Sequence, residues 1–154
     1  MPSYKRIINK LINKNITIST AESCTGGLLA STITKIKDSS KIFIGGYVTY
    51  SNKLKIRDLN VGKTTIEKYG AVSKETGMEM ANGLYLKNKT NICISTTGVA
   101  GPGGGTKIKP VGLVYIGILI NGKNKVFKKK FSGSRINIQK NCVSFIFDYL
   151  DKSI

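Results

Sequence analysis

Residues 16–36, ITISTAESCTGGLLASTITKI, contain the segment that decides the fold. Ile16–Thr20 alternates in polarity and is rich in β-branched side chains, which predicts a β-strand. A short turn at Ala21–Thr25 follows. Gly26–Ile36 then carries leucine and isoleucine at helical spacing and predicts a helix. The chain therefore contains a strand, a short turn and a helix in direct succession.

Similar patterns cover the rest of the chain. A short first helix is predicted because Ile7, Ile8, Leu11 and Ile12 recur on one helical face. Further helices are predicted at Ser51–Leu59, Ser73–Leu86 and Ile138–Leu150. Strands are predicted at Lys41–Tyr50, Asn91–Thr96, Val111–Ile120 and Val126–Phe131. Strands that alternate with helices, followed by adjacent strands, predict an α/β fold, a three-layer α/β/α domain with a mixed sheet. With 154 residues and no linker or repeat, a single domain over residues 1–154 is expected.

Composition excludes several classes of protein. Apolar residues make up 40% of the chain, enough for a hydrophobic core. The longest apolar run, Val111–Ile120, is half of the roughly 20 residues that a membrane helix needs, so no membrane partner is expected. The first residues show no secretory signal, and three cysteines at unrelated spacings suit reduced thiols, so a cytoplasmic location is expected. The absence of histidine excludes Ser-His-Asp and Cys-His catalysis and any zinc site with a histidine ligand.

The net charge of +17 raises the question of nucleic-acid binding. Of the 25 basic residues, 22 are lysine and only Arg6, Arg57 and Arg135 are arginine. The lysines are spread along the chain, and no aromatic residues are interleaved with them as a base-stacking surface requires. The pattern favours a solvated lysine-rich surface. A nucleic-acid partner is not expected, and the alternative predicts strongly salt-dependent binding that does not depend on Ser23.

Three segments could carry chemistry, each at the end of a predicted strand. The turn before the Gly26–Ile36 helix contains Ser23, and a nucleophile there would lie beside unpaired helix amides. Equally, Ser23 or Thr25 could simply cap the helix. The second segment ends at Tyr50 and leads to Lys55, which could act as a general base if burial lowers its pKa.

The third segment is Ser95–Thr106, where a strand runs into a glycine-rich loop whose amides could bind an anion. Strand ends of one sheet converge on the same edge. Together, the three segments predict a pocket for a small, anionic ligand.

Five ordered motifs of this chain, AESCTGG, GGYVTYSNKLK, GAVSKET, TTGVAGPGGGTKIKPVG and FSGSR, resemble the CinA C-terminal domain family. Its stand-alone members are nicotinamide-nucleotide amidases. The resemblance covers roughly Ile7 to Leu150. It implies hydrolysis of the carboxamide of nicotinamide mononucleotide (NMN) to nicotinate mononucleotide and ammonia, a step that recycles pyridine nucleotides for NAD metabolism. It implies no metal ion and no organic cofactor.

The resemblance also implies roles for individual residues. Ser23 matches the nucleophile, Lys55 the catalytic lysine and Tyr50 the tyrosine beside it. Arg135 is expected to bind the substrate phosphate. The full set expected to bind substrate is Glu22, Thr25, Gly26, Gly27, Thr97, Gly98, Gly101, Gly103 and Arg135.

The expected mechanism is acyl transfer. Neutral Lys55 takes the proton of Ser23, directly or through Tyr50, and Ser23 attacks the carboxamide carbon. Amides at the start of the helix that follows Thr25 are expected to hold the oxyanion. Cys24 is the less favoured nucleophile, because neighbouring residues on a helix diverge by about 100°.

Some residues depart from the family pattern. Relatives often have a second arginine after FSGxR, where this chain has Gln139 and Lys140, and Lys140 is expected to replace it only in part. Two alternative functions remain open at this stage: a non-catalytic nucleotide-binding or competence-associated module, and an amidase that acts on a related carboxamide. Oligomeric state is also left open, a homo-oligomer included.

Overall fold

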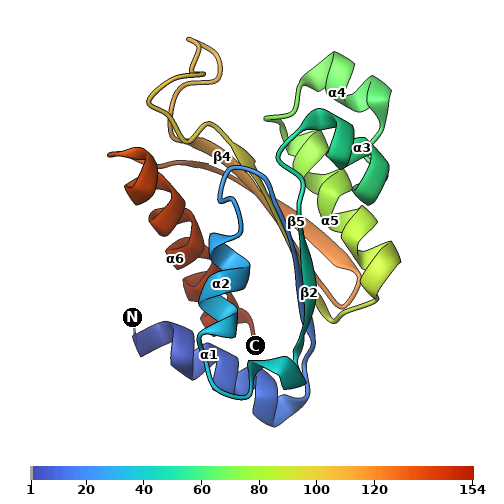
Figure 1. Cartoon of the computed structure of the whole chain (residues 1–154), viewed down its shortest axis with the longest axis vertical. Helices are drawn as coiled ribbons and strands as arrows, with labels where there is room; N and C mark the ends of the chain where they lie inside the picture. The colour runs from blue at the N-terminus through green and yellow to red at the C-terminus, as the bar shows by residue number, and fades with distance from the viewer. Residues whose placement is uncertain (1) are drawn as a thin grey trace.

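A computed structural model describes residues 2–154 of the chain. A five-stranded mixed sheet lies between two layers of helices (Figure 1). The elements, in order, are α1 (Pro2–Lys14), β1 (Ile18–Glu22), α2 (Leu28–Thr34), the 3-10 turn η1 (Ser39–Lys41), β2 (Phe43–Val48), α3 (Asn52–Leu59), α4 (Lys63–Tyr69), α5 (Lys74–Asn88), β3 (Ile92–Gly98), β4 (Leu113–Ile120), β5 (Lys123–Lys130) and α6 (Arg135–Ser153). The predicted α/β class and mixed sheet are confirmed.

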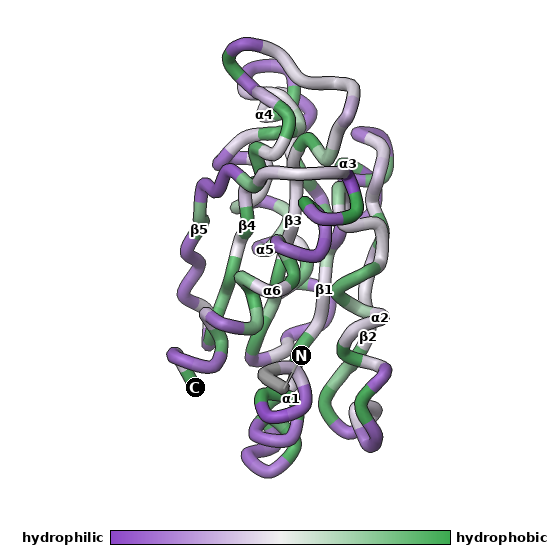
Figure 2. Tube along the Cα trace, turned by 90° about the vertical axis from the view of Figure 1, so that its left-hand side faces the viewer, coloured by the Kyte–Doolittle hydropathy of each residue, from purple (hydrophilic) through white to green (hydrophobic). Residues whose placement is uncertain are grey.

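The strands lie in the order β2-β1-β3-β4-β5, which Figure 2 shows with β5 on the left and β2 on the right. β1 pairs in parallel with β2 and β3, whereas β4 pairs antiparallel with β3 and β5. The parallel strands are joined by helical crossovers, as parallel pairing requires. The carboxyl ends of β1, β2 and β3 therefore meet at one edge of the sheet, and this edge carries the site described below.

Each face of the sheet has its own apolar core. Helices α1, α2 and α6 cover one face, and α5 covers the other together with α3 and α4 (Figure 1). Because successive strand residues point to opposite faces, Ile92 and Ile94 join the first core while Cys93 joins the second. The backbone of Gly83 in α5 lies so close to α3 that a Cβ atom there would stand 1.7 Å from the carbonyl oxygen of Leu59. This contact fixes how closely α3, the helix that carries Lys55, packs on α5.

The structure differs from the sequence prediction at several boundaries. β1 extends to Glu22, which the sequence placed in a turn. α2 begins only at Leu28, because Gly26 and Gly27 have φ values of 57° and 101°, in the left-handed region that glycine adopts readily. β2 runs from Phe43 to Val48 rather than from Lys41 to Tyr50.

Helix α4 was not predicted. Its sequence, KTTIEKY, has no apolar periodicity and none of its residues is fully buried. Contacts from elsewhere hold its first turn, since the Glu79 carboxylate accepts hydrogen bonds from the Gly62 amide and the Thr65 hydroxyl. Within residues 2–154, no helix has both the length and the apolar character needed to cross a membrane.

Candidate active site

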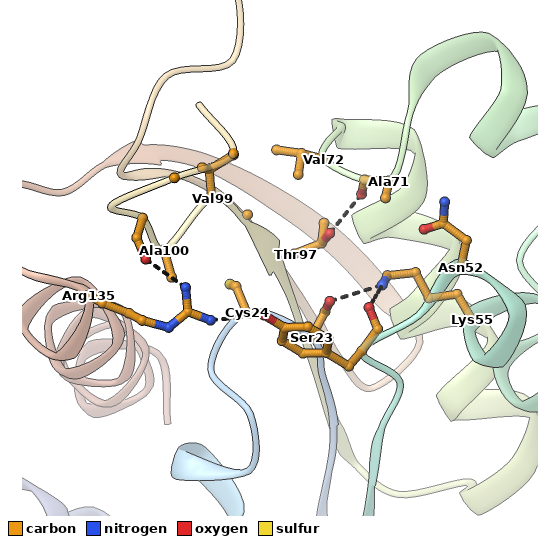
Figure 3. A pocket seen from close by; sticks show the side chains of 15 residues that line it. Ser23, Cys24, Asn52, Lys55, Ala71, Val72, Thr97, Val99, Ala100 and Arg135 are labelled. Atoms are coloured by element: carbon orange, nitrogen blue, oxygen red, sulfur yellow. Dashed lines mark hydrogen bonds between the residues drawn. The ribbon is translucent and has the colours of Figure 1, made fainter. Parts of the chain in front are cut away.

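A cavity of about 280 Å³ opens at the edge where β1, β2 and β3 end (Figure 3). Small-molecule sites typically measure roughly 300–1,000 Å³, so the cavity suits a small ligand or the reactive end of a larger one. Its lining comes from Ser23, Cys24, Tyr50, Asn52, Lys55, Ala71, Val72, Thr97, Gly98, Val99, Ala100, Gly101, Gly103, Gly104 and Arg135. The three segments singled out in the sequence therefore meet in one place.

Ser23 is the first residue after β1 and is buried at the floor of this cavity. Its backbone amide donates to the Thr96 carbonyl at 3.0 Å, which ties the turn to the neighbouring strand β3. A second hydrogen bond, from the Gly26 amide to the Ser23 carbonyl at 3.0 Å, closes the turn. Both contacts fix the backbone of Ser23 and leave its hydroxyl directed at Lys55 (Figure 3).

Lys55 lies in the first half of α3 and reaches Ser23 across the cavity floor. The helix is positioned by its N-cap, since the Ser51 hydroxyl accepts a hydrogen bond from the Leu54 amide. The Lys55 amine lies 2.9 Å from the Ser23 hydroxyl oxygen, 2.9 Å from the Thr49 carbonyl oxygen and 3.1 Å from the Tyr50 carbonyl oxygen. Only 1% of the residue is exposed, which makes it one of the largest fully buried side chains.

Burial also sets the electrostatics of Lys55. Desolvation lowers the pKa of the Lys55 amine, because a charged group loses its hydration there. None of the ion pairs found within residues 2–154 includes Lys55. A neutral amine has two N–H donors and one lone pair. The carbonyls of Thr49 and Tyr50 can take both donors, so the lone pair is left for the Ser23 proton.

The Tyr50 side chain does not lie between Ser23 and Lys55. Its hydroxyl accepts a hydrogen bond from the Arg135 guanidinium at 2.9 Å, and Lys55 contacts only its backbone carbonyl. The predicted proton relay through the phenol therefore has no geometric basis, because Ser23 and Lys55 are in direct contact. Arg135 also donates to the Gly101 carbonyl at 2.6 Å, so the phenol helps to hold the arginine against the glycine-rich loop.

Thr97, Gly98, Gly101 and Gly103 line the cavity as the sequence suggested. The Thr97 hydroxyl donates to the Ala71 carbonyl at 2.7 Å, which joins β3 to the segment before α5. Among the described residues, the backbone amides of Gly101, Gly103 and Gly104 donate to no acceptor. These amides are free to bind a ligand at the cavity mouth.

Four residues expected to bind substrate, Glu22, Thr25, Gly26 and Gly27, lie outside the cavity lining. The Glu22 carboxylate is buried and accepts hydrogen bonds from the Thr25 hydroxyl at 2.6 Å and from the Leu29 and Ala30 amides at 2.8 and 3.0 Å. Glu22 therefore has a structural role, because it stabilises the start of α2. The Leu29 and Ala30 amides are therefore not available to hold an oxyanion, whereas the Thr25 and Gly27 amides, in the turn before α2, donate to no acceptor within residues 2–154.

Two further expectations change. Cys24 lines the cavity, but burial raises the pKa of its thiol to about 12, so it is not a thiolate at neutral pH. Lys140 lies in a different hollow, beside Tyr4 and Lys35, and cannot substitute for a second arginine here. Gln139 donates to the Cys24 carbonyl at 2.9 Å and so supports the Ser23 turn instead of binding ligand.

Six lining residues were not named individually as binding residues. Four of them lie within the predicted segments, namely Asn52, Val99, Ala100 and Gly104, and two lie outside them, Ala71 and Val72. Asn52 lies within the same motif as Lys55, and Ala71 and Val72 belong to the GAVSKET motif. Their positions within these motifs could have identified them as lining residues. In the described part of the chain, no group of three or more Cys, Asp or Glu side chains is placed to hold a metal ion.

Comparison with known proteins identifies a family that matches the chain. The CinA C-terminal domain model matches residues 2–154. A competence-damage inducible protein of Clostridium botulinum (strain Langeland) is 53% identical over 148 residues, and a CinA-like protein of Kosmotoga olearia is 47% identical over 148 residues. Each alignment covers 96% of this chain but 36% of the relative, so the chain spans about a third of the length of these proteins.

Solved structures of similar proteins have the same fold. The crystal structure of a competence/damage inducible protein from Agrobacterium tumefaciens has a TM-score of 0.94 and 37% identity, covering 98% of this chain and 93% of that one. A CinA superfamily protein from Escherichia coli has a TM-score of 0.93 and 32% identity, covering 99% and 88%. These two structures therefore share the fold of this chain.

Proposed function

Because the chain belongs to the CinA C-terminal domain family, we propose that it hydrolyses the carboxamide of NMN to nicotinate mononucleotide and ammonia. The observation that carries the proposal is the buried Lys55 amine, 2.9 Å from the Ser23 hydroxyl. A serine paired with a lysine of lowered pKa is an arrangement that can attack an amide without histidine. The choice of NMN rests on the resemblance of the five motifs to nicotinamide-nucleotide amidases.

In the first half of the proposed reaction, neutral Lys55 accepts the Ser23 proton while the Ser23 oxygen bonds to the carboxamide carbon. The tetrahedral intermediate then collapses. Its C–N bond breaks, and the Lys55 ammonium returns the proton to the leaving nitrogen, which departs as ammonia. In the second half, Lys55 takes a proton from water, the hydroxide attacks the ester, and Ser23 recovers its proton. General base catalysis of this kind contributes typically about 10²–10⁴-fold.

The oxyanion needs donors that the protein does not already use. We assign this role to the loop amides of Gly101, Gly103 and Gly104, which line the cavity and have no acceptor within residues 2–154. A preorganised donor typically contributes about 10²–10³ in rate, because its dipole is aligned before the charge develops.

Arg135 is suited to the phosphate of the substrate. It is exposed at the cavity rim, and its two hydrogen-bond partners, the Gly101 carbonyl and the Tyr50 hydroxyl, are both neutral. Its charge is therefore not compensated by any carboxylate in the described ion pairs. A guanidinium can bind a phosphate through two parallel hydrogen bonds. In this proposal Tyr50 positions Arg135 and takes no part in proton transfer, and the reaction occurs in the cytoplasm.

Ammonia release from NMN tests the proposal, with purified protein in the presence of EDTA. Ser23→Ala should abolish release, and Ser31→Ala, an exposed serine of α2, should leave it unchanged. Release that survives Ser23→Ala would overturn the mechanism but not the substrate. A folded wild type that releases no ammonia from NMN would overturn the substrate assignment. Release from another carboxamide would then indicate a related amidase, and NMN binding without turnover a non-catalytic module.

A further inference from the structure

The mouth of the cavity lies between two walls. Val99 and Ala100, from the glycine-rich loop that joins β3 to β4 over residues 99–112, form one wall. Ala71 and Val72, which connect α4 to α5, form the other wall (Figure 3). These two segments are far apart in the sequence. Contacts between them therefore decide how the cavity mouth is shaped.

One side chain of the loop reaches the opposite wall. The Lys109 amine donates a hydrogen bond to the carbonyl of Tyr69, the last residue of α4, at 2.5 Å. Carbonyls in the last turn of a helix have no partner within the helix, and lysine side chains can bind them. Gly70 comes next, and a Cβ atom there would stand 2.6 Å from the Lys109 nitrogen. The amine therefore occupies a place that a side chain at position 70 would fill.

Local hydrogen bonds hold the backbone of Lys109. Its amide donates to the Thr106 hydroxyl at 2.9 Å, and its carbonyl accepts from the Thr106 amide at 2.8 Å, so the two residues close a tight turn. Pro110 follows, and its ring restricts the backbone further. None of the ion pairs found within residues 2–154 includes Lys109. The charge of Lys109 is therefore directed to the end of α4 and not to a carboxylate.

Packing inside the loop connects this turn to the cavity. The Val111 side chain lies against both Gly101 and Gly105, so closely that a Cβ atom at Gly105 would stand 2.8 Å from it. The Gly112 amide donates to the Val99 carbonyl at 2.7 Å and closes the base of the loop. Because the two arms of the loop are packed together, a displacement at residue 109 would also move the amides at the cavity mouth.

Two cations hold the loop from opposite sides of the sheet. Arg135, at the start of α6, donates to the Gly101 carbonyl at 2.6 Å, and Lys109 joins the loop to α4. Helix α6 covers one face of the sheet, and α4 belongs to the layer on the other face (Figure 1). The loop therefore spans the edge of the sheet between the two helical layers. Loss of either cation would release one side of the loop.

We propose that Lys109 is a positioning residue, which anchors the loop to α4 and so holds the loop amides at the cavity mouth where the reaction needs them. The proposal rests on the proposed function, in which the amides of Gly101, Gly103 and Gly104 hold the oxyanion. Lys109 is not among the residues that line the cavity, so it acts through the loop and not on the substrate. Hydrogen-bond donors stabilise a developing charge best when they are aligned beforehand, and the anchor supplies this alignment.

Trypsin cleavage tests the anchor without any substrate. The Lys107–Ile108 bond lies in the loop, and both of its residues are exposed. The Lys109–Pro110 bond resists trypsin because proline follows the lysine, so a substitution at 109 removes no cleavage site. Cleavage follows the fraction of loops that are open when opening and closing are fast. We expect Lys109→Cys to speed cleavage after Lys107 by about tenfold, the lower end of the effect of one hydrogen bond to a charged group.

Chemical rescue separates the amine from other effects of the substitution. Alkylation of the new thiol by 2-bromoethylamine restores an amine at almost the same distance from the backbone as in lysine. The three native cysteines are buried and should not react. We expect alkylated Lys109→Cys to be cleaved as slowly as the wild type. Lys123→Cys, at an exposed lysine of β5, is the matched control and should be cleaved after Lys107 like the wild type before and after alkylation.

Kinetics of ammonia release from NMN on the same samples test the positioning role. A misplacement of about 1 Å can cost roughly 10²-fold in rate, so we expect Lys109→Cys to lower kcat by up to that factor. KM should change little, because the loop amides act in the transition state. The pH midpoint of kcat/KM should stay the same, because the contact between Ser23 and Lys55 is not altered. Alkylation should restore kcat.

The two measurements have separate outcomes. Cleavage that Lys109→Cys does not change, or that alkylation does not slow again, would overturn the anchor. Faster cleavage with an unchanged kcat would overturn the positioning role, as would a loss of kcat that alkylation fails to reverse. A wild type that releases no ammonia from NMN would count against the proposed function, and cleavage would still decide whether Lys109 anchors the loop.

Discussion

Replacing Glu22 with glutamine separates a structural role from a role in substrate binding. The residue lies directly before Ser23, and its side chain is 1% exposed. Its carboxylate accepts hydrogen bonds from the Thr25 hydroxyl and from the first amides of α2, at Leu29 and Ala30. Glutamine has nearly the same shape, so the change removes acceptor capacity without creating a cavity.

The magnitude follows from these contacts. One carboxylate oxygen accepts from Thr25 and Leu29, and the other accepts from Ala30. In glutamine a nitrogen replaces one oxygen, so at least the Ala30 amide loses its acceptor and faces another donor. A hydrogen bond to a charged group contributes about 1.5–3 kcal/mol, and a buried unsatisfied donor is costly. We expect Glu22→Gln to lower the free energy of unfolding by about 2.5 kcal/mol, or the melting temperature by about 8 °C.

Urea unfolding followed by circular dichroism measures this change, with steady-state kinetics on the same samples. Glu67→Gln is the matched control, since Glu67 is exposed and its ion pair with Lys63 spans 3.9 Å, so its effect should stay within about 0.5 kcal/mol. If Glu22→Gln unfolds like the control, the structural assignment is refuted. A higher KM without loss of stability would instead indicate that Glu22 binds the substrate.

Four further predictions concern catalysis and packing. Lys55→Met should lower kcat for ammonia release by about 10²–10⁴-fold, whereas Lys53→Met, at an exposed neighbouring residue, should leave kcat unchanged. Equal effects of the two substitutions would show that Lys55 is not the general base. Burial lowers the pKa of Lys55, and the neutral amine is the proposed base. We therefore expect kcat/KM to rise with pH, with the midpoint of the rise at a pH below roughly 10.4, the usual pKa of lysine. A kcat/KM that does not change with pH would contradict this. Iodoacetamide at pH 8 should not abolish the proposed ammonia release, since the Cys24 pKa is about 12. Rapid loss of release with one thiol modified would disprove this. Finally, Gly83→Ala should destabilise the fold by more than about 2 kcal/mol in urea unfolding, because its Cβ atom would meet the Leu59 carbonyl, and unchanged stability would show that the helices can separate freely.

Local patterns in the sequence were enough to define the fold and the position of the site. Apolar periodicity located the strand at Ile16–Thr20 and the helix after it, and the boundaries shifted by only a few residues. The strand order came only from the structure, in which parallel pairing of β1 with β2 and β3 brings the ends of these strands together. Helix α4 escaped prediction because it has no apolar face of its own, and contacts from Glu79 fix its first turn.

Ser23, Lys55 and the glycine-rich loop are therefore named by the sequence, but their chemistry is decided by tertiary structure. The motif at residues 45–55 singles out Lys55 among 22 lysines, but only packing buries its amine between Ser23 and two backbone carbonyls. The same holds for Glu22 and Tyr50, whose side chains turn toward α2 and Arg135 and away from the reacting atoms. The physical reason is that periodicity depends on neighbours along the chain, whereas desolvation and side-chain direction depend on residues that meet only after folding.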